Sequence, residues 1–259
     1  MYLDAPDRGC GGSMIDSKHV LTAAHCVANI SGQFYTSPIR IVGGIDRLGS
    51  KSPTRVFADV STVYVPTEYF NQKDNGIMVG DIAVLKLKQH LRISPDAYLE
   101  LPDNKTYNGV KASISGFGWN NVKMRIRKSG MFEVGKTTGH LRFAEARVQS
   151  RKNCQQWHYW QIKNSHICAK IVPNSLVSPK GVCAGDSGGP LVYKKRIILG
   201  VLSSSAIGCT EFFIPAVYTR VSHYIDFIQN IRKNIEDPRI VSKSLPTLKE
   251  NVECCFNNE

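Results

Sequence analysis

The chain has 259 residues, enough for one large all-β domain or two small ones, and its apolar and aromatic content is ordinary for a globular protein. It has no run of about 20 apolar residues, which excludes a transmembrane helix. The formal net charge is +12, from 33 Lys and Arg against 21 Asp and Glu, and a solvated basic surface explains it more simply than an anion-binding function.

Eight cysteines in a chain of this size indicate an oxidising compartment. Their spacing alone does not give the pairing, and the lack of a C-x-x-C pair argues against a structural zinc site. The first six residues have neither the basic region nor the apolar core of a signal peptide, so we expect a signal upstream of this chain. Triplets at Asn29 and Asn104 fit the N-glycosylation pattern, which also arises by chance.

The first half of the chain predicts short strands. Residues 11–15 and 19–21 are expected to form a hairpin that leads to His25, with further strands over 55–60, 63–65 and 82–87. A polar loop over residues 71–76 would lie near the cleft. Many short strands with turn signals favour antiparallel barrels over alternating strands and helices.

The second half is expected to begin after a join near residues 95–108, with a strand at the start of residues 111–119. Residues 120–140 are rich in Lys, Arg and Gly, and we expect a long mobile loop there. A solvated loop is preferred to an anion-binding one, and the lack of interleaved aromatic residues argues against a nucleic-acid module. Residues 155–160 form an aromatic cluster, for which core packing is the default and a wall of the cleft the alternative.

A helix is predicted near the C-terminus. Ser222 can cap it, and its apolar stripe at helical spacing consists of Tyr224, Ile225, Ile228, Ile231 and Ile235. Asp237 and Pro238 would end it. Residues 237–259 are polar and are expected to form a tail without a core role.

Three stretches contain the residue types that a serine nucleophile needs. Residues 185–190, Gly-Asp-Ser-Gly-Gly-Pro, place Ser187 among glycines, so that the backbone N–H groups of Gly185 and Ser187 can approach a reacting carbonyl. A serine hydroxyl also needs a base, and residues 22–26 offer His25. Residues 81–87 offer Asp81 at the start of an apolar strand.

In this order the three motifs closely resemble those of the chymotrypsin-like (trypsin-like) serine endopeptidases, and the resemblance runs from Cys10 to about Ile235. It implies that Ser187 is the nucleophile and that His25 acts first as base and later as acid. It also implies that Asp81 orients His25 and that Ser203 supports Asp81. The oxyanion hole would be formed by Gly185 and Ser187.

The resemblance implies an all-β fold of two six-stranded antiparallel Greek-key barrels with a C-terminal helix. The peptidase domain would span residues 1–236, with the first barrel over about 1–100, the second over 101–221 and the helix over 222–236. Residues 237–259 would form the C-terminal tail.

The resemblance also suggests the disulfides, which pair Cys10 with Cys26, Cys154 with Cys168, and Cys183 with Cys209. A further bridge that is frequent in the family is absent, because Ala112 and Tyr193 occupy its two positions. Cys254 and Cys255 are left over. They are open to a strained vicinal bridge, to pairing with another chain or to pairing with a missing segment.

In the family, a new N-terminus of the Ile-Val-Gly-Gly type inserts its ammonium beside the Asp before the nucleophile, here Asp186. None of the nine residues before Cys10 resembles such a terminus, so we expect the activation site and any pro-segment upstream. Residues 41–44 spell that motif, but a cut before Ile41 would release the segment that holds His25. We therefore interpret residues 40–44 as a strand and turn.

The resemblance places the substrate pocket at Gly181, Val182, Ser205 and Ala216. Gly181 stands where trypsin-type members have an Asp that selects Lys or Arg. An unpaired Lys or Arg in an apolar pocket costs several kcal/mol, so we expect uncharged apolar residues before the scissile bond. Ser204 replaces a Trp that is frequent in the family, which leaves the more distant subsites open.

The resulting hypothesis is a secreted, extracellular serine endopeptidase that hydrolyses peptide bonds through an acyl-enzyme. No cofactor and no essential calcium are expected, since residues 45–53 offer only Asp46 as a carboxylate. Its partners would be protein or peptide substrates and protein protease inhibitors, with no nucleic acid and no membrane. The alternative is a catalytically silent or zymogen-like form that acts as a binding or regulatory protein. A basic glycan- or nucleic-acid-binding protein is a third reading, which rests on net charge alone.

Overall fold

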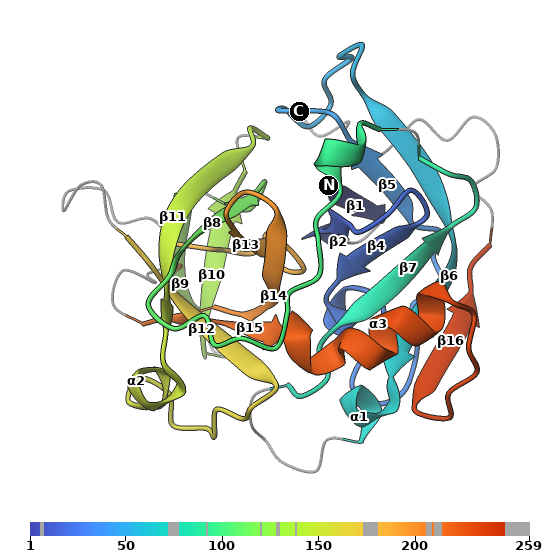
Figure 1. Cartoon of the computed structure of the whole chain (residues 1–259). Helices are drawn as coiled ribbons and strands as arrows, with labels where there is room; N and C mark the ends of the chain where they lie inside the picture. The colour runs from blue at the N-terminus through green and yellow to red at the C-terminus, as the bar shows by residue number, and fades with distance from the viewer. Residues whose placement is uncertain are drawn as a thin grey trace.

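The computed structural model describes residues 1–5, 8–71, 78–91, 93–119, 121–127, 130–137, 139–172, 181–205, 209 and 214–246. It consists mostly of β-structure, with two barrel-like sheets side by side and a short C-terminal helix (Figure 1). This architecture confirms the predicted fold class. Among the described residues, no helix is long and apolar enough to cross a membrane.

The first sheet contains eight of the described strands, in the order β2-β1-β5-β6-β7-β4-β3, with β16 paired to β6. It therefore has two strands more than the expected six. Its strands are β1 (Tyr2–Ala5), β2 (Arg8–Gly11), β3 (Ser13–Met14), β4 (His19–Thr22), β5 (Arg40–Gly43), β6 (Val56–Pro66), β7 (Ala83–Leu87) and β16 (Ile240–Ser244). Short helical segments lie between them: η1 (Ala24–Cys26), α1 (Thr67–Phe70) and η2 (Pro95–Ala97).

Strand β5 confirms the interpretation of residues 40–44. It pairs with β1 on one side and with β6 on the other, and Ile41 and Val42 are buried in the first barrel. Cleavage before Ile41 would cut the sheet in its middle.

Strand β16 corrects the expectation for the tail. Residues 240–244 pair with residues 62–66 of β6, on the edge of β6 opposite to the one that pairs with β7. Leu245 is buried in the hydrophobic core of the first sheet. The side chains of Lys243 and its two neighbours are exposed and polar, and this polarity is typical of a tail in the sequence. The segment is nevertheless a strand, because its backbone forms hydrogen bonds with β6. The prediction of no core role is therefore wrong for residues 240–245.

The second sheet is a closed six-stranded barrel with a core of its own, in the order β11-β12-β15-β14-β13-β8. Strand β14 is buried along nearly its whole length, and Leu191 of β13 and Tyr218 of β15 fill the interior. The strands are β8 (Lys111–Gly116), β11 (Arg142–Gln149), β12 (His166–Ile171), β13 (Pro190–Tyr193), β14 (Ile197–Ser204) and β15 (Ala216–Arg220).

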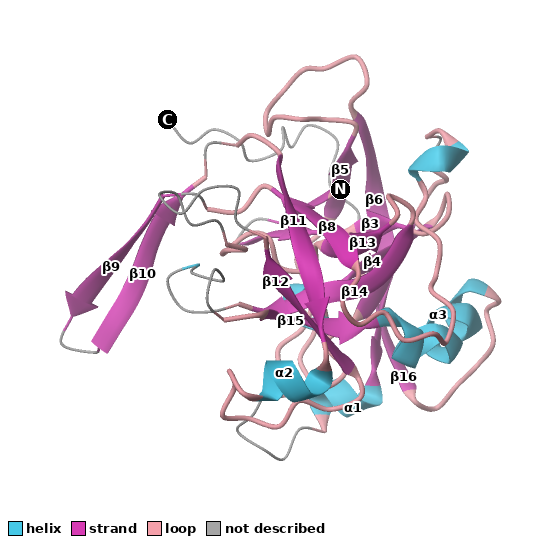
Figure 2. Ribbon diagram, turned by 60° about the vertical axis from the view of Figure 1, so that its left-hand side comes forward, coloured by secondary structure: helices cyan, strands magenta, loops and turns pink. Residues whose placement is uncertain are grey.

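Residues 121–127 and 130–136 form a β-ribbon where a mobile loop was expected. Strands β9 (Asn121–Arg127) and β10 (Gly130–Lys136) pair only with each other, and Figure 2 shows the ribbon projecting from the body of the protein. The sequence carried a signal for it, since apolar residues alternate with basic ones over residues 122–127. The high density of Lys and Arg masked this alternation.

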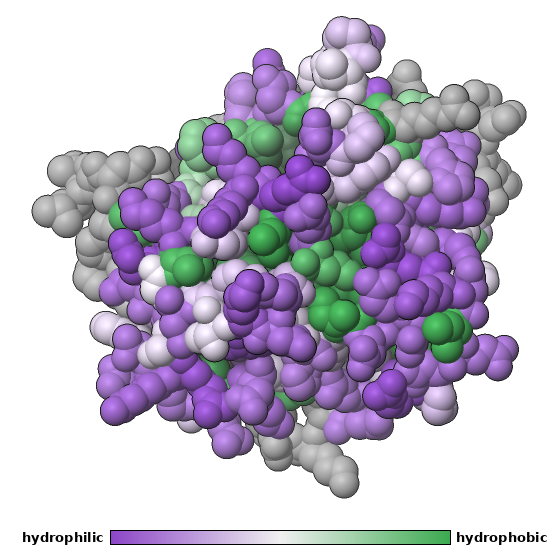
Figure 3. All heavy atoms as spheres, viewed as in Figure 1, coloured by the Kyte–Doolittle hydropathy of each residue, from purple (hydrophilic) through white to green (hydrophobic). Residues whose placement is uncertain are grey.

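The C-terminal helix α3 (Ile225–Arg232) follows a 3-10 turn, η4 (Val221–Tyr224), and buries Phe227, Ile228 and Ile231 against the first barrel. It is shorter than the predicted helix over residues 222–236. Asn234 adopts a left-handed backbone with φ of 52°, which ends the helix, and Ile235 is exposed. Hydrophilic residues cover most of the face shown in Figure 3, with hydrophobic residues gathered near its centre.

Candidate active site

His25 and Asp81 meet at the ends of two neighbouring strands. His25 lies in η1, directly after β4, and Asp81 lies two residues before β7, which pairs with β4. The ring Nδ1 of His25 is 2.8 Å from Oδ2 of Asp81, and the backbone N–H of His25 donates to Oδ1 at 2.9 Å. Both carboxylate oxygens therefore hold the histidine, one through its ring and the other through its backbone.

The second barrel also holds Asp81. Ser203, at the end of β14, donates from Oγ to Oδ2 of Asp81 at 2.5 Å, and Thr219 of β15 donates to its backbone carbonyl at 2.7 Å. Ser203 was predicted to lie there. Thr219 was missed, because nothing in its own sequence neighbourhood relates it to a residue 138 positions away.

The Asp81 side chain is fully buried, which by itself would raise its pKa. The charge and hydrogen bond of the His25 ring, together with hydrogen bonds from Ser203 and the His25 backbone, outweigh burial and hold the pKa below its ordinary value. Asp81 is therefore a carboxylate at neutral pH and accepts a hydrogen bond from Nδ1–H of His25.

The turn that carries Ser187 packs against the segment before His25. The N–H of Gly11 donates to the carbonyl of Ser187 at 2.7 Å, and Thr22 Oγ1 donates to the carbonyl of Gly11 at 2.9 Å. Gly188 has a φ of 77°, and a Cβ added to it would lie 2.3 Å from Thr22 Oγ1, so no larger residue fits there. The turn of the second barrel is thus brought against the first barrel beside His25.

A disulfide fixes this junction from the other side. Cys10, next to Gly11, is bonded to Cys26, next to His25. The two sulfurs and the His25 ring form a group within 4.8 Å, but disulfide sulfur is not a thiolate ligand, so this group does not form a metal site.

Two backbone N–H groups of the Ser187 turn are unused. Asp186 N–H donates to the carbonyl of Cys183, and Gly188 N–H to that of Leu202, each at 2.9 Å. Within the part of the chain that the structure describes, the N–H groups of Gly185 and Ser187 donate no hydrogen bond. These are the two donors that the sequence predicted for an oxyanion hole.

Asp186 is held by two backbone N–H groups. Its carboxylate accepts from Gly118 N–H at 2.8 Å and from Cys183 N–H at 2.9 Å. A Cβ on Gly118 would lie 2.4 Å from this carboxylate, which explains the glycine. Burial raises the pKa of Asp186 above its ordinary value despite these hydrogen bonds, and none of the described residues supplies a cation to it.

The predicted pocket residues lie on three segments: Gly181 and Val182 precede the Ser187 turn, Ser205 follows β14, and Ala216 begins β15. Val182 and Ala216 are buried, whereas Ser205 is exposed. A disulfide joins Cys183 to Cys209. Over residues 181–205 and 214–220, the only acidic side chain is that of Asp186, which is engaged elsewhere.

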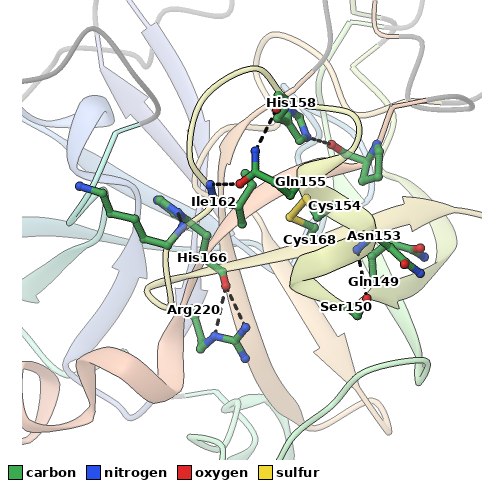
Figure 4. Close-up of a disulfide and its surroundings, with 12 residues drawn as sticks. Gln149, Ser150, Asn153, Cys154, Gln155, His158, Ile162, His166, Cys168 and Arg220 are labelled. Atoms are coloured by element: carbon green, nitrogen blue, oxygen red, sulfur yellow. Dashed lines mark hydrogen bonds between the residues drawn. A yellow bond between two sulfur atoms is a disulfide. The ribbon is translucent and has the colours of Figure 1, made fainter.

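The third disulfide, between Cys154 and Cys168, closes the loop with the aromatic cluster and joins α2 (Arg151–Gln155) to β12 (Figure 4). Core packing is wrong for Trp157 and Tyr159, which are 48% and 88% exposed.

The same loop contacts the segment before β15. His158 Nε2 lies 3.0 Å from the carbonyl of Pro215, the residue before Ala216, and the His158 ring stacks on Trp160. The loop is therefore attached to the start of β15, the strand that carries the predicted pocket residue Ala216.

Comparison with known proteins agrees with this arrangement. The family described as Trypsin matches residues 2–228. The chain belongs to the trypsin family. Trypsin eta of Drosophila melanogaster is 30% identical over 227 residues, which cover 86% of this chain and 76% of that protein. Granzyme M of Rattus norvegicus is 28% identical over 228 residues, covering 86% and 79%. Trypsin alpha-4 of Lucilia cuprina is 33% identical over 217 residues, covering 82% and 73%.

Membership of the trypsin family, together with the three disulfides, supports a chymotrypsin-like serine protease. Such proteases act on proteins or peptides.

Proposed function

We propose that this chain is a secreted serine endopeptidase in which His25, Asp81 and Ser187 form the catalytic triad. The observation that carries the proposal is the buried carboxylate of Asp81, which accepts from both His25 and Ser203. Residues from both barrels hold this carboxylate in place, as expected of an active site that lies between the two barrels.

The proposed mechanism follows from the tautomer of His25. Because Nδ1 carries a proton and donates a hydrogen bond to Asp81, Nε2 is the basic nitrogen of the neutral ring. It takes the proton of Ser187 Oγ as the oxygen attacks the carbonyl carbon of the scissile bond, and it then gives this proton to the leaving amine. Water attacks the resulting ester by the same route and releases the acid and free Ser187. No cofactor takes part in these steps.

The developing oxyanion would accept hydrogen bonds from the N–H groups of Gly185 and Ser187. These groups donate no other hydrogen bond among the described residues, so they need not exchange a partner during the reaction. Loss of one such donor typically costs about 10²–10³ in kcat.

For specificity, we propose uncharged apolar side chains before the scissile bond. Val182 and Ala216 offer buried apolar surface, and Gly181 offers no carboxylate. The test is a set of peptides that differ only in having Phe, Leu, Ala or Arg at that position. A clear preference for Arg would refute the assignment.

The proposed location is extracellular. Three disulfides are stable in an oxidising compartment, and trypsin-family proteins are typically secreted. The proposed partners are protein or peptide substrates and protein inhibitors that occupy the same cleft.

One observation favours a second candidate, a zymogen-like form that binds or regulates without cleaving. Asp186, the proposed partner of an activating ammonium, is buried with a raised pKa and has no cation among the described residues. A buried carboxylate without a cation is costly when ionised, and a site that depends on it would favour another arrangement.

Labelling with a fluorophosphonate probe, measured by intact mass, separates the two candidates. Labelling that is abolished by Ser187→Ala establishes a working nucleophile and oxyanion hole. No labelling of this chain, with labelling of a form extended to an Ile-Val-Gly-Gly-type N-terminus, establishes the zymogen-like form. Failure of both forms to label refutes the endopeptidase.

A further inference from the structure

A second polar site lies on the first barrel, apart from the triad. It is a pocket of about 560 Å³ between the start of β4, the end of β7 and the end of α3, the helix seen in front of these strands in Figure 1. All ten residues that line it are polar or charged. Pockets for apolar ligands are lined mainly by hydrophobic side chains, so this pocket is suited to a hydrophilic ligand.

The pocket lies at the ends of β4 and β7 that are remote from the proposed catalytic residues. His19 pairs with Lys86 at the pocket, and Thr22 pairs with Ala83 near the triad. The two pairs are three residue steps apart along β4, a distance of about 10 Å at about 3.3 Å per residue. The pocket and the proposed catalytic residues therefore lie toward opposite ends of these two strands.

Positive charge dominates the lining. Four cationic side chains, those of Lys18, Lys86, Arg232 and Lys233, face one carboxylate, that of Asp16. Asp16 is already fully used: it accepts from Arg232 Nε at 2.8 Å, from the His19 ring at 2.9 Å and from two backbone N–H groups. Among the described lining residues, the three lysines are therefore left without a balancing anion.

These lysines are placed to bind a ligand. Lys86 Nζ donates to Asn234 Oδ1 at 2.8 Å, which holds one ammonium at the rim and leaves its other N–H groups for a ligand. Lys18 and Lys233 form no ion pair with any described residue. Separate ammonium groups around one pocket are suited to an oligoanion with several charged groups.

The remaining lining provides neutral hydrogen-bonding groups. Ser17 and Gln229 line the pocket, and Ser17 Oγ lies 2.7 Å from His90 Nδ1. Hydroxyl groups of a sugar complement such a lining. Nucleic-acid bases do not, because they stack on aromatic side chains and the lining has no Phe, Tyr or Trp.

We propose that this pocket binds a sulfated glycan, with sulfate groups on Lys18, Lys86 and Lys233 and sugar hydroxyls on the neutral polar groups. Such a site would tether the protein to a sulfated polysaccharide. It does not depend on catalysis, so Ser187→Ala should bind the glycan as the unmodified chain does.

The test is titration calorimetry with a size-defined, fully sulfated heparin hexasaccharide. Lys18→Gln combined with Lys233→Gln should weaken binding about tenfold, because two charge contacts are lost. By analogy with counterion release from nucleic acid, the slope of log affinity against log salt should also fall by about 2. The matched control is Lys152→Gln combined with Lys163→Gln, two exposed lysines of the second barrel, which removes the same charge and should stay within about twofold of the unmodified chain.

An equal loss in the two double variants would mean that only net charge matters and would overturn the site. Acetylation footprinting locates the contact independently: the hexasaccharide should protect Lys18, Lys86 and Lys233 but leave Lys152 and Lys163 reactive. Equal protection of all five would likewise overturn it. Unchanged thermal unfolding of both variants verifies that they are folded.

Three other ligands test the chemical class. The unsulfated hexasaccharide should not bind measurably, because it lacks the charges that the lysines require. Hexaglutamate and a single-stranded DNA hexamer carry charge without sulfated sugars and should bind more weakly than the sulfated hexasaccharide. If either binds as tightly as the sulfated sugar and loses as much in the Lys18 and Lys233 variant, the glycan assignment is wrong.

Discussion

Ser203→Ala tests how far the second barrel supports the proposed triad. The substitution removes the hydroxyl that donates to Asp81 Oδ2 at 2.5 Å in a fully buried environment. A hydrogen bond to a charged group contributes about 1.5–3 kcal/mol. Asp81 keeps both donors from His25, so the carboxylate should stay ionised and hold the ring less firmly.

The rate of fluorophosphonate labelling at Ser187 should therefore fall about 10- to 100-fold, since about 1.4 kcal/mol corresponds to a factor of ten. The labelling rate constant is measured on this chain if it reacts with the probe, and otherwise on the form extended to an Ile-Val-Gly-Gly-type N-terminus. The free energy of unfolding in urea should fall by about 1–3 kcal/mol, because Asp81 loses a donor in a buried site.

Two controls separate support of the site from general destabilisation. Ser203→Thr keeps a hydroxyl and should recover much of the labelling rate. Ser113→Ala removes only a weak 3.5 Å hydrogen bond elsewhere in the second barrel and should change neither measurement. Reduced stability with an unchanged labelling rate would refute the reasoning, because Ser203 would then support the fold and not Asp81.

Three further predictions concern the proposed substrate pocket and two buried titratable groups, His166 and Asp186. Gly181→Asp should shift cleavage toward peptides with Arg, because it supplies the missing carboxylate; retained apolar preference would show that Gly181 does not face the substrate. Burial lowers the pKa of His166, so the folded state resists its protonation. Stability should decline as the pH falls below about 6.5, the ordinary histidine value, and His166→Gln should flatten this decline in urea unfolding. Burial raises the pKa of Asp186, so its carboxyl should titrate by NMR above its ordinary value, and an Ile-Val-Gly-Gly-type N-terminus should lower that pKa. An unchanged value would mean that no ammonium reaches it.

The motifs around His25, Asp81 and Ser187 are recognisable in the sequence because each is local. Each occupies a few consecutive residues next to a strand or a glycine-rich turn, so the residue types are visible without the fold. The interactions among them are not local: the His25–Asp81 contact joins residues 56 positions apart, and the Ser203–Asp81 contact joins residues 122 apart. Family resemblance supplied Ser203, whereas Thr219 had no such signal.

The errors in the predicted fold arose where packing and local composition disagree. The β9–β10 ribbon looked like a loop because its basic residues outweighed its alternation. Strand β16 looked like a tail because it contributes backbone hydrogen bonds and exposes polar side chains. The helix α3 ends early because Asn234 adopts a left-handed backbone, which the apolar residue after it, Ile235, obscured.

The order and spacing of residue types were therefore sufficient to predict the family, the class of fold, and the segments that carry His25, Asp81 and Ser187. These features depend on local chemistry and on periodicity along the chain. The hydrogen bond from Thr219 to Asp81, the pairing of β16 with β6 and the basic pocket at Lys18 and Lys233 could not be predicted in this way. Each depends on which distant segments pack together and on how much water they exclude, and these are properties of the folded chain as a whole.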